Sequence, residues 1–378
     1  MLPPPATVGW KDDRGPGLKP EEPRDALFQL VKTLCDLPGP IGHEDAVQDW
    51  IADRWGGFAQ EVRRTRVDNI LAKVGGSGRR LVIMAHADEI CFMVKSIHDD
   101  GFLHLWPYYG DTRGYPPRWV MPLNQPVLVL TGSGTVEGVF ATASGHVFAA
   151  RDKPDARWEW NDWFIDIGVG SRAEAEALGI HPGCRIIRNP PTRRLGASHI
   201  VGKAMDDRAA LAIATLAGEA LAGREDLAYE VWLASTIQEE NGLIGAQSVL
   251  DALDVDLCLN LDVGLVGDIP GPDRRDFPCK LGAGATIVYQ DMTAHYSRKL
   301  SDRLVAIARE RGIPVQQAIF QNYGSDGAAL LRRGVEAALV TYPTRYTHSP
   351  IETVDERDLR ACVDLLVAFA TAPRDGRP

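Results

Sequence analysis

The sequence lacks long apolar runs, paired cysteines and an excess of positive charge. No uncharged apolar run approaches the roughly 20 residues that a membrane span requires, so we expect no membrane partner. The six cysteines are scattered and form no C-x-x-C pair, which favours reduced, mostly buried thiols in a cytoplasmic protein over a disulfide framework or a zinc finger. The formal net charge of −10 argues against a nucleic-acid partner, because proteins that bind nucleic acid gather basic residues.

Common nucleotide-binding and nucleophilic motifs are also absent. The chain has no nucleophile elbow, no Walker loop and no G-x-G-x-x-G fingerprint after its first strand. Residues 1–25 are rich in proline and charge and have no apolar core, so we expect a poorly ordered N-terminal arm rather than a secretory signal. The length of 378 residues predicts two domains, or one large domain with an insertion.

Strands alternate with helices in two stretches of the chain, residues 26–92 and 196–372. This alternation predicts an α/β domain with a mostly parallel sheet and helices on both faces. Between the two stretches, residues 93–195 contain short alternating segments separated by Gly/Pro-rich turns, which predict a small inserted β-barrel-like domain. Ligands of α/β proteins bind at the carboxyl edge of the sheet, so polar residues at strand ends are the candidate site residues.

One apolar run, residues 229–237, is followed closely by two adjacent carboxylates, Glu239 and Glu240. Partly buried carboxylates are costly unless they are protonated, paired or bound to metal. Adjacent residues of an extended chain point to opposite sides, so the two acids are expected to have different roles.

Polar residues also stand at the ends of other apolar runs and at the start of a helix. In the segment His86-Ala87-Asp88 the two polar side chains can lie on one side of the strand, where Asp88 can accept the spare N–H of His86. Asp206 opens a helix rich in alanine and leucine. Asp262 ends a further apolar run, and His348 lies in the loop after the last predicted strand.

Several of these acids also have a structural interpretation. Asp88 could cap a helix beside an incidental histidine, and Asp206 is favoured at a helix N-terminus by the helix dipole and by capping. Asp326, before another predicted helix, is more typical of an N-cap than of a catalytic group. Together, however, two histidines and three carboxylates suit two divalent cations such as zinc, cobalt or manganese.

At this point the sequence resembles the glutamyl-aminopeptidase and tetrahedral (TET) group of dinuclear metallo-aminopeptidases, also labelled cellulase M. The resemblance runs from Leu37 to about Ala370 and is carried by five motifs in order. They are His86-Ala87-Asp88-Glu89-Ile90, Gly202-Lys203-Ala204-Met205-Asp206-Asp207-Arg208, Gln238-Glu239-Glu240, Leu261-Asp262-Val263 and Arg345-Tyr346-Thr347-His348-Ser349-Pro350-Ile351-Glu352.

The resemblance implies a role for each matching residue. His86 and Asp262 would bind one metal ion, Glu240 and His348 the other, and Asp206 would bridge both. The two ions are expected to be zinc or cobalt, with manganese as a further option.

The resemblance also implies a mechanism and partners. Asp88 would orient His86, and Glu239 would act as general base and acid. The expected substrates are peptides with a free N-terminus, from which N-terminal residues are removed. The resemblance further implies homo-oligomers, from dimers to dodecamers, assembled partly through the inserted β-rich domain.

Two departures and three alternative functions accompany this resemblance. Cys91 stands where the family usually has glycine, and Asn241 where it usually has valine; both concern the shape of the pocket rather than the ligands.

A related dizinc deacylase or amidohydrolase would use similar ligands but would accept N-acetylated substrates. A glycosidase would need two carboxyl groups placed across a sugar. An inactive scaffold would have kept the fold but lost catalysis.

Overall fold

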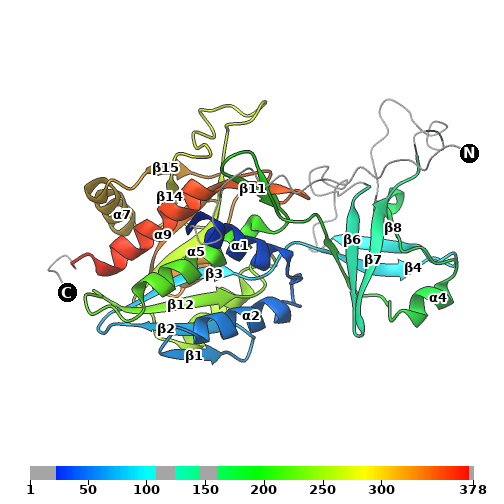
Figure 1. Ribbon diagram of the computed structural model, residues 1–378, viewed down its shortest axis with the longest axis horizontal. Coiled ribbons are helices and arrows are strands. Elements are labelled where there is room, and N and C mark those ends of the chain that lie inside the picture. The colour runs from blue at the N-terminus through cyan, green and yellow to red at the C-terminus, as the bar shows by residue number, and fades with distance from the viewer. Residues whose placement is uncertain (1–22, 108–123, 145, 147–159, 374–378) are drawn as a thin grey trace, which may run out of the picture.

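The computed structural model describes residues 23–107, 124–144, 146 and 160–373, which form an α/β part beside a smaller β-barrel (Figure 1). The predicted N-terminal arm therefore lies outside the described residues, except for residues 23–25 at the start of the first helix. None of the described helices is long and apolar enough to cross a membrane.

In the described residues, the α/β part is built on an 11-stranded mixed sheet. Its strands are β1 (Glu61–Arg64), β2 (Ile70–Gly75), β3 (Arg80–His86), β10 (Arg193–Leu195), β11 (His199–Gly202), β12 (Glu230–Thr236), β13 (Leu257–Leu265), β14 (Ala285–Gln290), β15 (Val315–Ile319), β16 (Glu336–Arg345) and β17 (Glu352–Asp355). Their order is β1-β2-β12-β3-β13-β16-β17-β11-β10, and β14 pairs with both β15 and β16.

Parallel pairing is confined to part of this sheet, although the sequence predicted a mostly parallel one. The pairs β12–β3, β3–β13, β13–β16 and β14–β15 are parallel, whereas the pairs toward both ends of the sheet are antiparallel. Two of the antiparallel pairs arise where the connection between consecutive strands is short. Residues 65–69 join β1 to β2 and residues 196–198 join β10 to β11, and connections of this length allow only hairpins.

Helices cover both faces of the sheet, as predicted. The helices packed on one face are α1 (Pro23–Asp36), α2 (Asp45–Gly56), α5 (Met205–Leu221), α7 (Arg298–Arg311) and α9 (Glu356–Thr371), and those on the other are α6 (Ile244–Ala252) and α8 (Gly327–Arg332). Strand β3 contributes to both cores: Leu81 and Ile83 pack into the first, while Val82 and Met84 pack into the second. This division follows from the alternation of side chains along a strand.

The inserted segment folds as a closed antiparallel barrel, which agrees with the predicted β-barrel-like fold (Figure 1). Its elements are β4 (Phe92–Ile97), β5 (Leu103–Pro107), β6 (Pro126–Thr131), β7 (Gly134–Ala141), η2 (Trp160–Asp162), β8 (Phe164–Asp166), α4 (Arg172–Ala177) and β9 (Arg185–Arg188). The strands close in the order β4-β5-β8-β7-β6-β9. Phe92, expected to end the α/β stretch, begins the barrel, and residues 193–195, expected to end the insert, form β10 of the large sheet.

The parallel registers align the carboxyl ends of β12, β3 and β13. Thr236 pairs with His86, and Asn260 pairs with Met84. If the register between β3 and β13 is continued by two residues beyond the pair Asn260–Met84, Asp262 lies opposite His86. Polar residues that end three separate apolar runs therefore meet at one edge of the sheet, where α/β proteins bind their ligands.

The turn between β12 and α6 carries Glu239 and Glu240 and is held by the buried side chain of Asn69. The amide oxygen of Asn69 accepts the backbone N–H of Ile237 at 3.2 Å, and its Nδ2 donates to the backbone oxygen of Gly245 at 2.9 Å. A Cβ atom at Gly245 would lie 2.5 Å from the backbone nitrogen and oxygen of Ile237. Only glycine allows this approach of α6 to the turn.

Gly245→Ala is therefore expected to lower the free energy of unfolding by about 1–3 kcal/mol, because the added methyl group forces two backbone segments apart. Gly56→Ala is the matched control, since a Cβ at this last residue of α2 meets nothing within 4 Å. We expect the control to be neutral or slightly stabilising. Urea unfolding of both variants and the parent measures the difference, and a Gly245→Ala protein as stable as the parent would contradict the close contact.

Candidate metal centre

All seven residues that the sequence singled out meet at this edge of the sheet. Five of them line a cavity of about 270 Å³, namely Asp206, Glu239, Glu240, Asp262 and His348. The other two, His86 and Asp88, are buried and contact Asp206 and the backbone of the glutamate pair.

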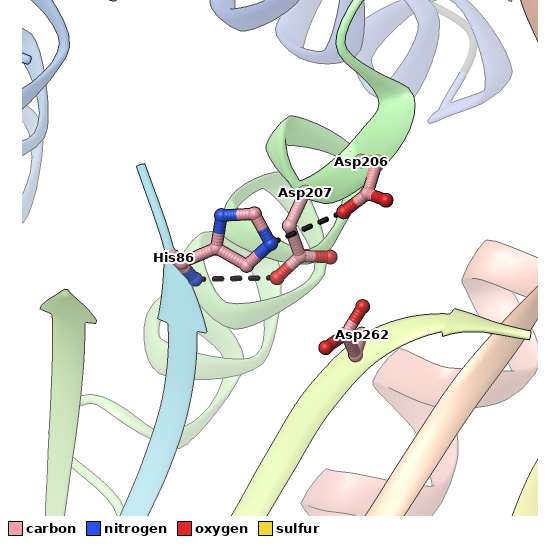
Figure 2. Close-up of side chains that lie close together, drawn as sticks. All are labelled: His86, Asp206, Asp207 and Asp262. Carbon is pink, nitrogen blue, oxygen red and sulfur yellow. Dashed lines mark hydrogen bonds and ion pairs between the residues drawn. The ribbon is translucent and has the colours of Figure 1, made fainter. Parts of the chain in front are cut away.

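Figure 2 shows the first of two groups of potential metal ligands. His86 ends β3, Asp262 lies on β13, and Asp206 and Asp207 are in the first turn of α5. One potential ligand atom from each of the four residues lies within 4.8 Å of the others. The closest recorded contact among them joins His86 Nε2 to Asp206 Oδ1 at 3.1 Å.

Asp206 also belongs to the second group, together with Glu240 and His348. His348 Nε2 lies 3.3 Å from Asp206 Oδ2 and 3.2 Å from Glu240 Oε1. Asp206 therefore directs one oxygen toward His86 and the other toward His348. A single carboxylate is shared between the two groups.

Asp207 joins the first group, although the sequence did not indicate it as a site residue. Its Oδ1 accepts the hydroxyl of Tyr342 at 2.6 Å, and its Oδ2 accepts the backbone N–H of His86 at 3.2 Å. Both oxygens are thus engaged in tying α5 to β16 and β3. These bonds favour a supporting role for Asp207 over that of a ligand.

Asp88 contacts more of the site than the sequence predicted. Its Oδ1 lies 3.3 Å from His86 Nδ1, the ring atom that it was expected to orient. The same oxygen accepts the backbone N–H of Glu239 at 2.9 Å, and Oδ2 accepts that of Glu240 at 3.1 Å. One fully buried carboxylate therefore positions the histidine and both glutamates.

Two further side chains hold the potential ligands, and the sequence predicted a role for neither. Glu352 accepts the backbone N–H of Asp206 at 3.0 Å and that of His348 at 2.8 Å, one with each oxygen. Ser325 donates its hydroxyl to Asp262 Oδ2 at 2.5 Å. The position of Glu352 within a recognised motif was the available signal, whereas nothing around Ser325 indicated its contact.

Asp326 does not cap the helix that it precedes, contrary to the interpretation from sequence. It occupies the N-cap position of α8 but makes no side-chain capping hydrogen bond. Its Oδ2 instead accepts the hydroxyl of Thr236, at the end of β12, at 2.5 Å. Burial raises the pKa of Asp326 to about 7, so the group is a further buried acid near the site.

Burial dominates the electrostatics of the acids. It raises the pKa of Asp262 to about 8 and the pKa of Glu239 well above its usual value, and neighbouring carboxylates add to both shifts. Burial also opposes ionisation of Asp206, but the two histidines outweigh it and lower the pKa of that group. Conversely, burial disfavours the imidazolium forms of His86 and His348, yet their carboxylate neighbours raise both pKa values well above 6.5.

This set of donors fits divalent cations. Glu240 Oε1 is buried without a hydrogen bond, and its recorded charged neighbour is the imidazole of His348. Imidazole nitrogens and carboxylate oxygens are common ligands of zinc, cobalt and manganese. Cations would take the place of the protons that the cluster otherwise holds, which offsets the cost of burying several carboxylates together.

A family model and proteins of known structure match most of the chain. The model described as M42 glutamyl aminopeptidase matches residues 68–365. The lysyl aminopeptidase of Pyrococcus furiosus is 27% identical over 349 residues, which cover 90% of this chain and 96% of the relative. Aminopeptidase APDkam598 of Desulfurococcus kamchatkensis superposes with a TM-score of 0.84 at 30% identity, covering 93% of this chain and 96% of that one. The TET1 peptidase of Pyrococcus horikoshii, which assembles into a tetrahedron or a large octahedral shell, superposes with a TM-score of 0.80 at 27% identity, covering 91% and 99%.

The raised pKa values predict that the metal-free protein loses stability as the pH rises. Asp262 retains its proton in the folded state up to about pH 8, whereas in the unfolded chain it ionises near pH 4. Between these values the folded state binds more protons than the unfolded state, so the free energy of unfolding falls with rising pH. The raised pKa values of both histidines act in the same direction above about pH 6.5.

The midpoint of thermal unfolding of chelator-treated protein should therefore fall between about pH 5.5 and about pH 8. Acids with a lowered pKa, such as Glu230, are already ionised in both states above about pH 5.5 and leave this slope unchanged. Burial lowers the pKa of His43 and His104, which opposes the fall only up to about pH 6.5. Zinc added near pH 8 should raise the midpoint again. A midpoint that stays constant or rises with pH in the metal-free protein would contradict the assignment of these buried groups.

Proposed function

The chain belongs to the M42 glutamyl aminopeptidase family, and we propose that it removes N-terminal residues from peptides with two divalent cations and a glutamate general base. Family membership makes it a metal-dependent hydrolase of peptide bonds. The number of cations, their ligands and the identity of the base are the proposal. The observation that carries it is the pair of potential ligand groups that share Asp206 beside the buried Glu239.

We assign the ligands according to these two groups. His86 and Asp262 hold one cation, Glu240 and His348 hold the other, and Asp206 contributes to both. Zinc or cobalt suits this donor set, and manganese is a further candidate. When bound, two such cations lower the pKa of a water molecule and polarise the carbonyl group of the scissile peptide bond.

Glu239 is the proposed general base and acid. Its carboxylate takes a proton from the attacking water and returns it to the leaving amine. Its side chain lines the same cavity as the ligands, and burial raises its pKa, which strengthens it as a proton acceptor. The hydrogen bond from its backbone N–H to Asp88 holds it beside His86, whose ring Asp88 also contacts.

We also propose that the chain forms homo-oligomers, as the TET1 peptidase of Pyrococcus horikoshii does. The inserted domain, residues 93–195, is proposed to supply part of the interface. Two large apolar side chains on the barrel are exposed, Val139 on β7 and Leu178 after α4.

Glu239→Gln should retain the bound metal but lose turnover, with kcat lower by about 10²–10⁴-fold, because the amide cannot accept the proton. Glu240→Ala should instead lose metal, since it removes a ligand. Metal content per subunit and hydrolysis of aminoacyl-p-nitroanilides, measured on the same preparations, separate the two effects. Glu225→Gln, an exposed substitution, is the control. Near-normal turnover by Glu239→Gln would show that another group is the base.

Peptides with a free N-terminus should release their first amino acid, whereas N-acetylated forms of the same peptides should not. The comparison is made by chromatography of matched peptide pairs incubated with the metal-loaded enzyme. Cleavage of the acetylated peptides at a similar rate would favour a deacylase or amidohydrolase instead.

A further inference from the structure

We propose that the enzyme prefers peptides whose N-terminal side chain is uncharged and apolar, an inference that rests on the proposed function. The matched family and one of its relatives are named for glutamyl and lysyl substrates. The residues that line the cavity in this chain favour neither of these side chains.

The cavity is lined by two chemically different sets of residues. The first set consists of the proposed ligands and the general base, Asp206, Glu239, Glu240, Asp262 and His348. The second set has an apolar part, Leu243, Val263, Leu265 and Tyr323. The proposed ligands bind the cations and the base transfers the proton. The remaining lining residues are therefore the ones that can contact the side chain of the residue to be removed.

Two polar groups of the second set are already bonded within the protein. The hydroxyl of Tyr323 donates to the backbone oxygen of Val263 at 2.8 Å. The hydroxyl of Thr347 donates to Asp206 Oδ2 at 2.9 Å. Asn322 adds only an uncharged amide. None of these groups can neutralise a charge on the substrate.

A glutamyl side chain would find no cation in this cavity, because no lysine or arginine is among the described residues that line it. Arg188 and Lys203 line an adjoining cavity that shares Asp206 and Glu240 with this one, but its volume is only about 10 Å³, too small for a glutamyl side chain. Lys203 Nζ bonds to Glu89 Oε1 at 2.7 Å, and Arg188 donates to the backbone oxygen of Ser349. Both cations are thus bonded within the protein.

A lysyl side chain would find no carboxylate in the cavity that is available to pair with its ammonium group. The acids that line the cavity are the proposed ligands and base, so they are engaged with the cations and the water. A charged group moved from water to an apolar site without a partner is strongly disfavoured. Both charged classes of substrate are therefore expected to react more slowly than leucyl or methionyl peptides.

The apolar residues are held in place by the protein core. Leu243 has a left-handed backbone conformation (φ 61°) at the start of α6, and its side chain belongs to the core beneath that helix. Val263 is 2% exposed and belongs to the main core. Because neither residue can move without disturbing a core, this part of the cavity keeps its apolar surface.

The test compares leucyl-, methionyl-, glutamyl- and lysyl-p-nitroanilide with the metal-loaded enzyme. The value of kcat/KM for the two apolar substrates should exceed that for the two charged ones by at least about tenfold. A glutamyl or lysyl substrate cleaved as well as the leucyl one would overturn the inference while leaving the proposed function intact.

A binding measurement separates this inference from the proposed function. Titration calorimetry with metal-loaded Glu239→Gln should show tighter binding of Leu-Ala than of Glu-Ala or Lys-Ala. If the enzyme cleaves none of the p-nitroanilides, the proposed function fails, and this binding order then decides the inference alone. Equal or tighter binding of Glu-Ala or Lys-Ala would overturn it.

Leu265→Lys places a cation among the apolar residues and should raise the ratio of glutamyl to leucyl kcat/KM by at least about tenfold. Met292→Lys is the matched control, because Met292 is 69% exposed and is not among the residues that line the cavity. Its ratio should equal that of the parent. A similar change in both variants would mean that overall charge, rather than the cavity, sets the preference.

Discussion

The site depends on one electrostatic constraint, which is the crowding of several carboxylates, most of them buried, with two imidazoles at one edge of a sheet. Burial and mutual repulsion favour protonated carboxyl groups, as the raised pKa of Asp262 shows. Asp206 is the exception, because each of its oxygens faces an imidazole and the two imidazoles lower its pKa. Cations are the other way to compensate the remaining acids, so the requirement for metal follows from the arrangement as a whole.

The fold meets this constraint by orienting the charged groups from several separate segments. Asp88, just after β3, accepts the backbone amides of both glutamates, and Glu352, at the start of β17, accepts those of Asp206 and His348. Ser325, just before α8, bonds to Asp262. These supporting groups are acids and a hydroxyl, so they fix the orientation of the ligands without adding a positive charge that would compete with a cation.

Local sequence patterns predicted much of this architecture, and their failures have physical causes. Helix α7 shows how local signals set the ends of an element, because it begins after the capping Ser297 and is followed by Gly312 in a left-handed conformation. The strands β1 and β10 were missed because most of their side chains are exposed, so they show no buried apolar pattern. Those two strands form two antiparallel hairpins of the sheet, which also has antiparallel pairs between strands distant in the chain, such as β2–β12 and β11–β17.

The sequence by itself determined which acids and histidines end the apolar runs, and the order of its motifs determined the family. Only the tertiary structure decided that Asp207 supports the site, that Asp326 turns from its own helix to Thr236, and that Leu265 helps to line the cavity. Propensities and caps act between neighbours in the chain. Thr236 and Asp326 are 90 residues apart, and such contacts exist only once distant strands have paired and buried the groups between them.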